Sequence, residues 1–92
     1  MRIVFRARAL RHLREIEHHI GQDNPKAAAR VIGRLETAIN TLADHPFSAP
    51  AGMVPGTRQL TLPGSPYLVV YRVAGDEITI LAVLHAARRI RS

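Results

Sequence analysis

The spacing of hydrophobic positions changes several times along this chain, and each spacing predicts a different element. Residues 2–6 hold three consecutive apolar side chains between arginines and are predicted to form a short strand. From residue 7 to residue 20 the apolar positions recur three and four apart, as on one face of a helix: Leu10, Leu13, Ile16 and Ile20. Gly21 is expected to end this helix in the left-handed conformation.

A boundary at Asn24 and Pro25 predicts where a second helix begins. Asparagine can cap the start of a helix with its side chain, and proline fits the first helical position, where an N–H group would lack a partner in any case. The helix is expected to carry a wider apolar stripe and to stop at residues 44–46, Asp-His-Pro. Because the link between them is short, the two helices are predicted to form an antiparallel hairpin.

The last third of the chain is predicted to form a three-stranded antiparallel meander. Residues 57–62 alternate between polar and apolar, while residues 67–73 and 77–85 are nearly continuous apolar runs joined by a tight turn at Gly75-Asp76. Both faces of the two long strands are apolar, so these strands are expected at the centre of the sheet. Strict alternation in the last strand would place four side chains on one face: Ile78, Ile80, Ala82 and Leu84.

The predicted fold class is therefore α+β, with an N-terminal strand, an antiparallel helical hairpin and a three-stranded antiparallel meander forming one sheet. The first strand is expected at an edge of the sheet or beside the last strand. The helical hairpin can cover one face of the sheet, which leaves the other face for the chain's own loops or for a partner.

Length and composition narrow the class of protein. A chain of 92 residues allows a single domain, expected to span residues 1–92, and 47% hydrophobic residues is ordinary for a chain that folds. No cysteine is present, so disulfides and thiolate metal sites are excluded. Arginines interrupt the first apolar run and no later run is long enough to span a bilayer, so we expect a soluble, cytoplasmic protein that does not contact membranes.

Charge adds a constraint on the partner. Thirteen Lys and Arg against seven Asp and Glu give a net charge of +6, and every cation except Lys26 is an arginine. Guanidinium groups bind phosphates and carboxylates in a bidentate manner, which favours nucleic acid or an acidic protein as the partner. A solvated, arginine-rich surface without a specific partner would explain the same composition.

The five histidines do not predict a metal site. His12, Glu15 and His19 have a helical spacing that would permit ligation, but solvated surface side chains explain the pattern better. His45 stands at a helix end, where a cation favours the helix dipole. His85 ends a core strand just before several arginines, and either acid–base chemistry or a structural hydrogen bond would account for it.

A basic set in the last third is the main candidate site. It is expected to gather at one end of the sheet and to contact an anionic or protein target: Arg58, Arg72, His85, Arg88 and Arg89. Arg91 is better explained as a solubilising residue at a strand edge. Phosphate-binding loops, serine nucleophile motifs and paired carboxylates are absent from the sequence, so no cofactor is expected and no catalytic residue can be assigned from motifs.

Four segments resemble the recurring segments of the RelE/ParE superfamily of type II toxins. They are Asn-Pro-Lys-Ala-Ala at 24–28, Gly-Thr-Arg-Gln-Leu at 56–60, Pro-Tyr-Leu-Val-Val-Tyr-Arg-Val at 66–73 and Ile-Leu-Ala-Val-Leu-His-Ala-Ala-Arg at 80–88. Each segment alone is a weak signal, but four in the right order and at the right separations are specific. The resemblance implies a growth-inhibiting toxin that is neutralised by a cognate antitoxin. An acidic antitoxin would explain the positive charge as well as nucleic acid does.

The superfamily has two known activities, and they are rival hypotheses for this chain. RelE-like members cleave messenger RNA on the ribosome, and on that hypothesis the catalytic candidates would be Arg88, His85, Arg58 and Arg72. ParE-like members inhibit DNA gyrase and are not nucleases.

Two departures from the RelE-like pattern favour the ParE-like branch. Pro63 stands where RelE-like members tend to place a catalytic arginine, and no tyrosine follows Arg88. The resemblance therefore implies a gyrase inhibitor rather than an enzyme. A basic nucleic-acid-binding module is a further alternative, which explains the charge but not the order of the elements.

Overall fold

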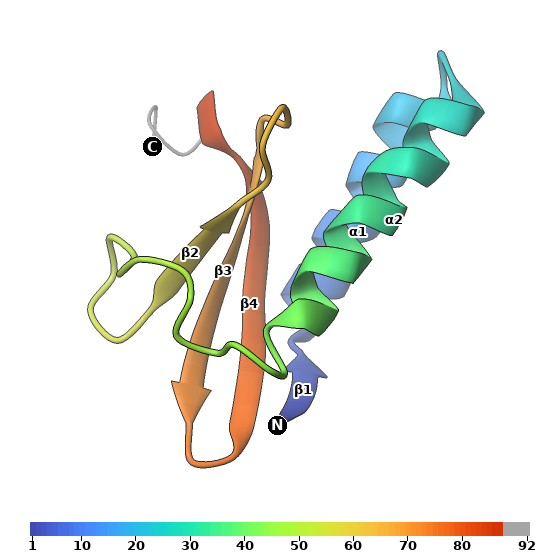
Figure 1. Cartoon of the computed structure of the whole chain (residues 1–92). Coiled ribbons are helices and arrows are strands. Elements are labelled where there is room, and N and C mark those ends of the chain that lie inside the picture. Colours follow the sequence, from blue (N-terminus) through green and yellow to red (C-terminus); the bar gives the residue numbers. More distant parts are fainter. Residues whose placement is uncertain (88–92) are drawn as a thin grey trace.

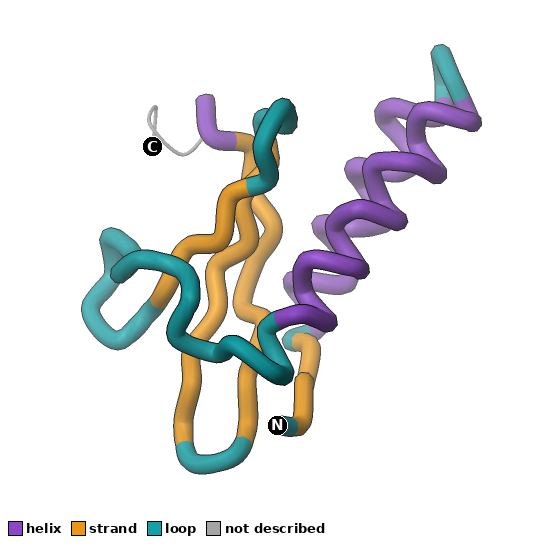
Figure 2. Tube along the Cα trace, in the orientation of Figure 1, coloured by secondary structure: helices purple, strands orange, loops and turns teal. Residues whose placement is uncertain are grey.

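The structure is a computed structural model that describes residues 1–87, and it places a helical hairpin against one face of a four-stranded sheet (Figure 1; Figure 2). The sheet order is β1-β4-β3-β2, with β1 parallel to β4 and the other neighbours antiparallel. This confirms the predicted α+β fold, including the place of the first strand beside the last. The elements in chain order are β1 (Arg2–Phe5), α1 (Ala7–Gly21), α2 (Pro25–Thr41), β2 (Arg58–Thr61), β3 (Tyr67–Ala74) and β4 (Glu77–His85).

The start of α2 is the local feature that the sequence defined best. The Asn24 side chain accepts a hydrogen bond from the Ala27 N–H group at 3.1 Å, and Pro25 occupies the first turn. The end of α1 differs from the prediction, because Gly21 remains helical instead of becoming left-handed. A side chain at Gly21 would begin 3.7 Å from the Ala28 methyl group, so the glycine lies where the two helices approach each other.

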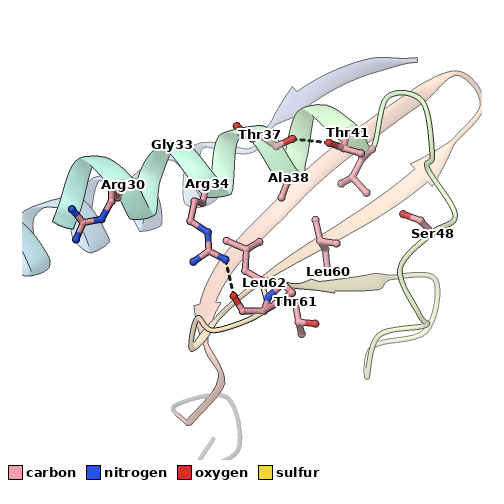
Figure 3. A pocket seen from close by; sticks show the side chains of 12 residues that line it. Arg30, Gly33, Arg34, Thr37, Ala38, Thr41, Ser48, Leu60, Thr61 and Leu62 are labelled. Atoms are coloured by element: carbon pink, nitrogen blue, oxygen red, sulfur yellow. Dashed lines mark hydrogen bonds between the residues drawn. The ribbon is translucent and has the colours of Figure 1, made fainter. Parts of the chain in front are cut away.

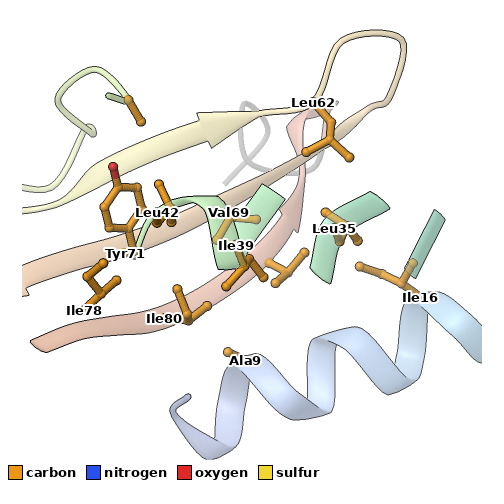
Figure 4. Close-up of a cluster of buried hydrophobic side chains, with 12 residues drawn as sticks. Ala9, Ile16, Leu35, Ile39, Leu42, Leu62, Val69, Tyr71, Ile78 and Ile80 are labelled. Atoms are coloured by element: carbon orange, nitrogen blue, oxygen red, sulfur yellow. The ribbon is translucent and has the colours of Figure 1, made fainter. Parts of the chain in front are cut away.

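The core lies between the hairpin and the facing side of the sheet (Figure 4). Leu35, Ile39 and Leu42, from α2 and the residue after it, are at most 1% exposed. They pack with α1 residues and with side chains of β3 and β4: Ala9, Ile16, Val69, Tyr71, Ile78, Ile80 and Val83. Burial of apolar surface is the dominant favourable contribution to folding, so this cluster is the main source of the fold's stability.

A β-bulge in β4 contradicts the prediction of strict alternation. Val70 pairs with Ala82 but Tyr71 pairs with Ile80, which leaves Leu81 as an extra residue in β4. An extra residue shifts the alternation of side chains by one position. As a result Val83 joins Ile80 on the helix-facing side, and Ala82 moves to the other face.

Within the described residues, no helix combines the length and the apolar character that crossing a membrane requires.

Candidate functional site

The structure does not bring the described members of the predicted basic set together. Arg58 pairs with Tyr71 across β2 and β3, so it lies on the same sheet face as the core, whereas Arg72 follows Tyr71 and points to the opposite face. His85 pairs with Tyr67 at the other end of the sheet. Arg72 pairs with Thr79, and the stretch of β4 from there to His85 measures roughly 20 Å at about 3.3 Å per residue.

The expectation of a single basic cluster is therefore wrong for Arg58, Arg72 and His85. The sequence shows that two residues lie in neighbouring strands, but the register decides which face and which end each one occupies. Arg88 and Arg89 lie outside the described residues, so their part in the set stays a prediction.

Arg58 holds a loop rather than facing solvent. Its Nη1 atom donates to the carbonyl oxygen of Ala49 at 2.7 Å and to that of Phe47 at 3.3 Å. The guanidinium carbon also lies 4.9 Å from the centroid of the Phe47 ring, which is a cation–π contact. These contacts explain why Arg58 is half-buried, and they turn its Nη1 group toward the loop.

Tyr71 holds the same loop from the sheet side. The side chain is fully buried, and its hydroxyl donates to the carbonyl oxygen of Pro46 at 2.8 Å. Burial raises the pKa of the Tyr71 hydroxyl above its ordinary value, while the Ala49 backbone and the charge of Arg58 act in the opposite direction. Tyr71 is therefore a neutral structural donor.

His85 is half-buried at the end of β4, in contact with an aromatic ring. Its ring meets that of Tyr67 edge to face, with centroids 5.5 Å apart and an interplanar angle of 88°. The Ala87 N–H group donates to Nδ1 of His85 at 3.2 Å, and this bond orients the imidazole. An imidazole and a phenol are thus in contact, and this contact is compatible with either structural packing or acid–base chemistry.

His12 has a role that the sequence reasoning missed. The Val83 N–H group donates to Nδ1 of His12 at 3.2 Å. This bond is needed because β1 pairs with β4 only as far as Ile80, and beyond that point α1 replaces the missing strand. The available signal was that His12 continues the apolar stripe, three residues after Ala9 and four before Ile16.

The environment of His12 favours its neutral form. Burial, followed by the charge of Arg8, lowers the pKa of His12 below its ordinary value, and Glu15 only partly opposes this. Residues 1–87 contain no group of three or more histidines and carboxylates arranged to hold a metal ion.

A groove of about 650 Å³ separates α2 from β2 (Figure 3). Ala38 of α2 faces Leu60 and Leu62 on the sheet side, which gives the groove an apolar centre. Arg30 and Arg34 stand along the helix at one end, and Arg34 donates to the carbonyl oxygen of Pro63 at 2.6 Å across the groove. An apolar centre flanked by guanidinium groups suits a peptide segment that carries both apolar and acidic side chains.

Comparison with known proteins gives one consistent family. Residues 3–90 match the family model described as the ParE toxin of type II toxin-antitoxin system, parDE. The Sinorhizobium fredii protein named "Putative toxin Y4kP" is 46% identical over 85 residues, covering 92% of this chain and 88% of that protein. Toxin RelE2 of Caulobacter vibrioides is 36% identical over 86 residues, covering 94% and 96%.

A solved structure supports the same grouping. The chromosomal ParDE TA system from P. aeruginosa contains a chain that superimposes with a TM-score of 0.83 at 26% identity, covering 92% of this chain and 95% of that one.

Proposed function

The chain belongs to the ParE toxin family of type II toxin–antitoxin systems, and we propose that it arrests growth by acting on DNA gyrase. The observation that carries this choice of target is the separation of Arg58, Arg72 and His85 over two faces and two ends of the sheet. A ribonuclease must place several cations around one phosphate, and these three cannot do so. Pro63, at the position where RelE-like toxins tend to carry a catalytic arginine, offers only its backbone carbonyl, to Arg34.

The second part of the proposal is that a cognate acidic antitoxin occupies the α2–β2 groove. The groove combines an apolar centre, Leu60 and Leu62, with Arg30 and Arg34 on the helix beside it. In a chain of net charge +6, an acidic segment gains long-range attraction as well as these local contacts. The likeness to a chain of a chromosomal ParDE TA system supports a partner of this kind.

The test is expression of the chain alone and together with its antitoxin, sought as a small acidic reading frame beside its gene. We expect growth arrest only without the antitoxin, and inhibition of gyrase supercoiling by the purified protein with messenger RNA left intact. Cleavage of messenger RNA on translating ribosomes would replace the gyrase proposal. Tight, salt-sensitive binding to bare duplex without either effect would support the nucleic-acid-binding alternative.

The ribonuclease alternative has one favourable observation, the contact between Tyr67 and His85. An imidazole and a phenol are residue types that serve as general acids and bases and that stack on RNA bases. If this alternative holds, His85→Ala should abolish messenger RNA cleavage while the protein stays folded. If the gyrase proposal holds, neither the wild type nor His85→Ala should cleave messenger RNA.

A further inference from the structure

The loop of residues 46–57, which forms most of the connection between α2 and β2, combines an absence of charge with exposed apolar side chains. None of its twelve residues is charged, although the chain carries thirteen Lys and Arg and seven Asp and Glu. Within residues 1–87 it holds the three most exposed large apolar side chains: Met53 at 76%, Val54 at 63% and Phe47 at 62%. In Figure 1 the yellow-green part of this loop projects past β2, on the side of the sheet away from the labelled helices.

Hydrogen bonds hold this 46–57 loop at both ends and across its middle. Arg58 and Tyr71 bind the carbonyl groups of Ala49 and Pro46. The Gly52 N–H group donates to the Thr57 carbonyl oxygen at 2.7 Å, and the Thr57 hydroxyl donates to the Val54 carbonyl oxygen at 2.6 Å. The exposed side chains therefore sit on an ordered backbone, so binding through them does not require the loop to be ordered first.

Gly52 shows how closely the loop is packed. A Cβ atom at this position would clash with the Thr57 hydroxyl oxygen and would lie 3.3 Å from the Thr57 carbonyl carbon. Any side chain at residue 52 would push the two strands of the loop apart. Glycine at residue 52 is thus required for the close approach of the loop to Thr57.

The chemistry of the loop selects the kind of partner. Nucleic acid and anionic membranes are bound largely through lysine and arginine, and the loop has neither. Nη1 of neighbouring Arg58 is turned toward the carbonyl oxygens of Phe47 and Ala49. An acidic antitoxin finds complementary charge at Arg30 and Arg34 in the groove but none here. Aromatic, methionine and aliphatic side chains without charges are typical of the core of a protein–protein interface.

We propose that the 46–57 loop docks into an uncharged apolar pocket of the toxin's protein target, with Phe47, Met53 and Val54 as the anchoring side chains. This rests on the proposed function, because it names the surface that a toxin of this family uses against its target. It also differs from the expectation based on charge, since it assigns target binding to an uncharged loop of a basic protein.

The experiment replaces the anchors without disturbing the fold. The double variant Met53→Ser/Val54→Ser is compared with Leu10→Ser, a control on α1 whose side chain is 43% exposed. Growth arrest without antitoxin, gyrase inhibition, antitoxin affinity and melting temperature are measured for each protein. Loss of anchoring residues at an interface centre should weaken target inhibition at least about 30-fold. Antitoxin affinity and melting temperature should match the wild type, and Leu10→Ser should remain fully toxic.

Several results would overturn the proposal. Wild-type toxicity in the double variant excludes the loop as a target contact. A parallel loss of antitoxin affinity makes the loop an antitoxin contact. Conversion of a wild-type dimer to monomers, monitored by size-exclusion chromatography of the same proteins, makes it a contact between copies. If the wild type arrests growth without inhibiting gyrase, the gyrase proposal fails, whereas the loop is still tested by growth arrest. If the wild type does not arrest growth at all, both proposals fall.

Discussion

Replacing His12 by alanine removes the acceptor that satisfies the Val83 N–H group, and the cost can be worked out from the structure. Val83 is 3% exposed, so its N–H group gains little compensation from water. Leaving a buried donor unsatisfied costs about 1–3 kcal/mol. Alanine recovers about 0.5 kcal/mol through its better helix propensity. We expect His12→Ala to lower the free energy of unfolding by about 1.5 kcal/mol, equivalent to roughly 6–12 °C in melting temperature for a chain of this size.

The same contact predicts a pH dependence with a definite sign. The pKa of His12 is lowered in the folded protein, so the unfolded chain binds this proton more readily in the window between the folded value and 6.5. His12 therefore contributes its stabilisation above pH 6.5 and loses it as the pH falls through that window. A protonated Nδ1 also cannot accept from Val83. The difference in stability between the wild type and His12→Ala should shrink on acidification.

The assay is urea unfolding of the wild type, His12→Ala and His12→Asn at pH 7.5 and at pH 5.5. Asparagine places an oxygen acceptor near the position of Nδ1, so it should recover part of the loss at pH 7.5 but show no narrowing at pH 5.5. Equal stabilities of the wild type and His12→Ala at pH 7.5 would refute the reasoning, as would a difference that widens on acidification.

Three further predictions concern the loop and the groove. Tyr71→Phe removes the hydrogen bond to Pro46 and should cost about 1 kcal/mol of unfolding free energy, measured by urea denaturation. Gly52→Ala should lower the free energy of unfolding by about 1–3 kcal/mol because its methyl group would clash with Thr57. Gly33→Ala, on α2 with open space around it, should raise the free energy of unfolding by about 0.5–1 kcal/mol. Thermal melting shows whether each variant is less or more stable than the wild type. The double variant Arg30→Ala/Arg34→Ala should weaken antitoxin binding at least about tenfold at low salt and by less at high salt, as measured by calorimetry. An equal loss of affinity at both salt concentrations would contradict the role of charge.

The features that sequence reasoning predicted well are those set by neighbouring residues. Asn24 and Pro25 define the start of α2, and Gly75 takes a positive φ of 60° in the turn between β3 and β4. Both depend on the conformational preferences of one or two residues, which the sequence displays directly. The order of the elements follows from such local signals, whereas the family resemblance rests on four segments of sequence.

The features that were missed depend on contacts between distant segments. The bulge at Leu81 has no local signal, because β4 is apolar on both faces and either phase of alternation fits the sequence. The sequence indicates a surface position for His12, and its role becomes visible only when α1 lies beside the part of β4 that β1 does not pair with. The predicted clustering of Arg58 with Arg72 was wrong for the same reason, since only the register shows that they point to opposite faces. A role of these residues in target binding stays a prediction.

The two proposed surfaces meet at Ser48, and this has a consequence for neutralisation. Ser48 lines the α2–β2 groove, and its neighbour in sequence, Phe47, is a proposed anchor of the 46–57 loop. An antitoxin segment that fills the groove would therefore end against the base of the loop, where a target pocket closing over Phe47 needs the same space. Antitoxin and target should exclude each other although they recognise different chemistry. Size-exclusion chromatography of toxin, antitoxin and gyrase should yield two binary complexes, and a stable ternary complex would show that neutralisation works at a distance.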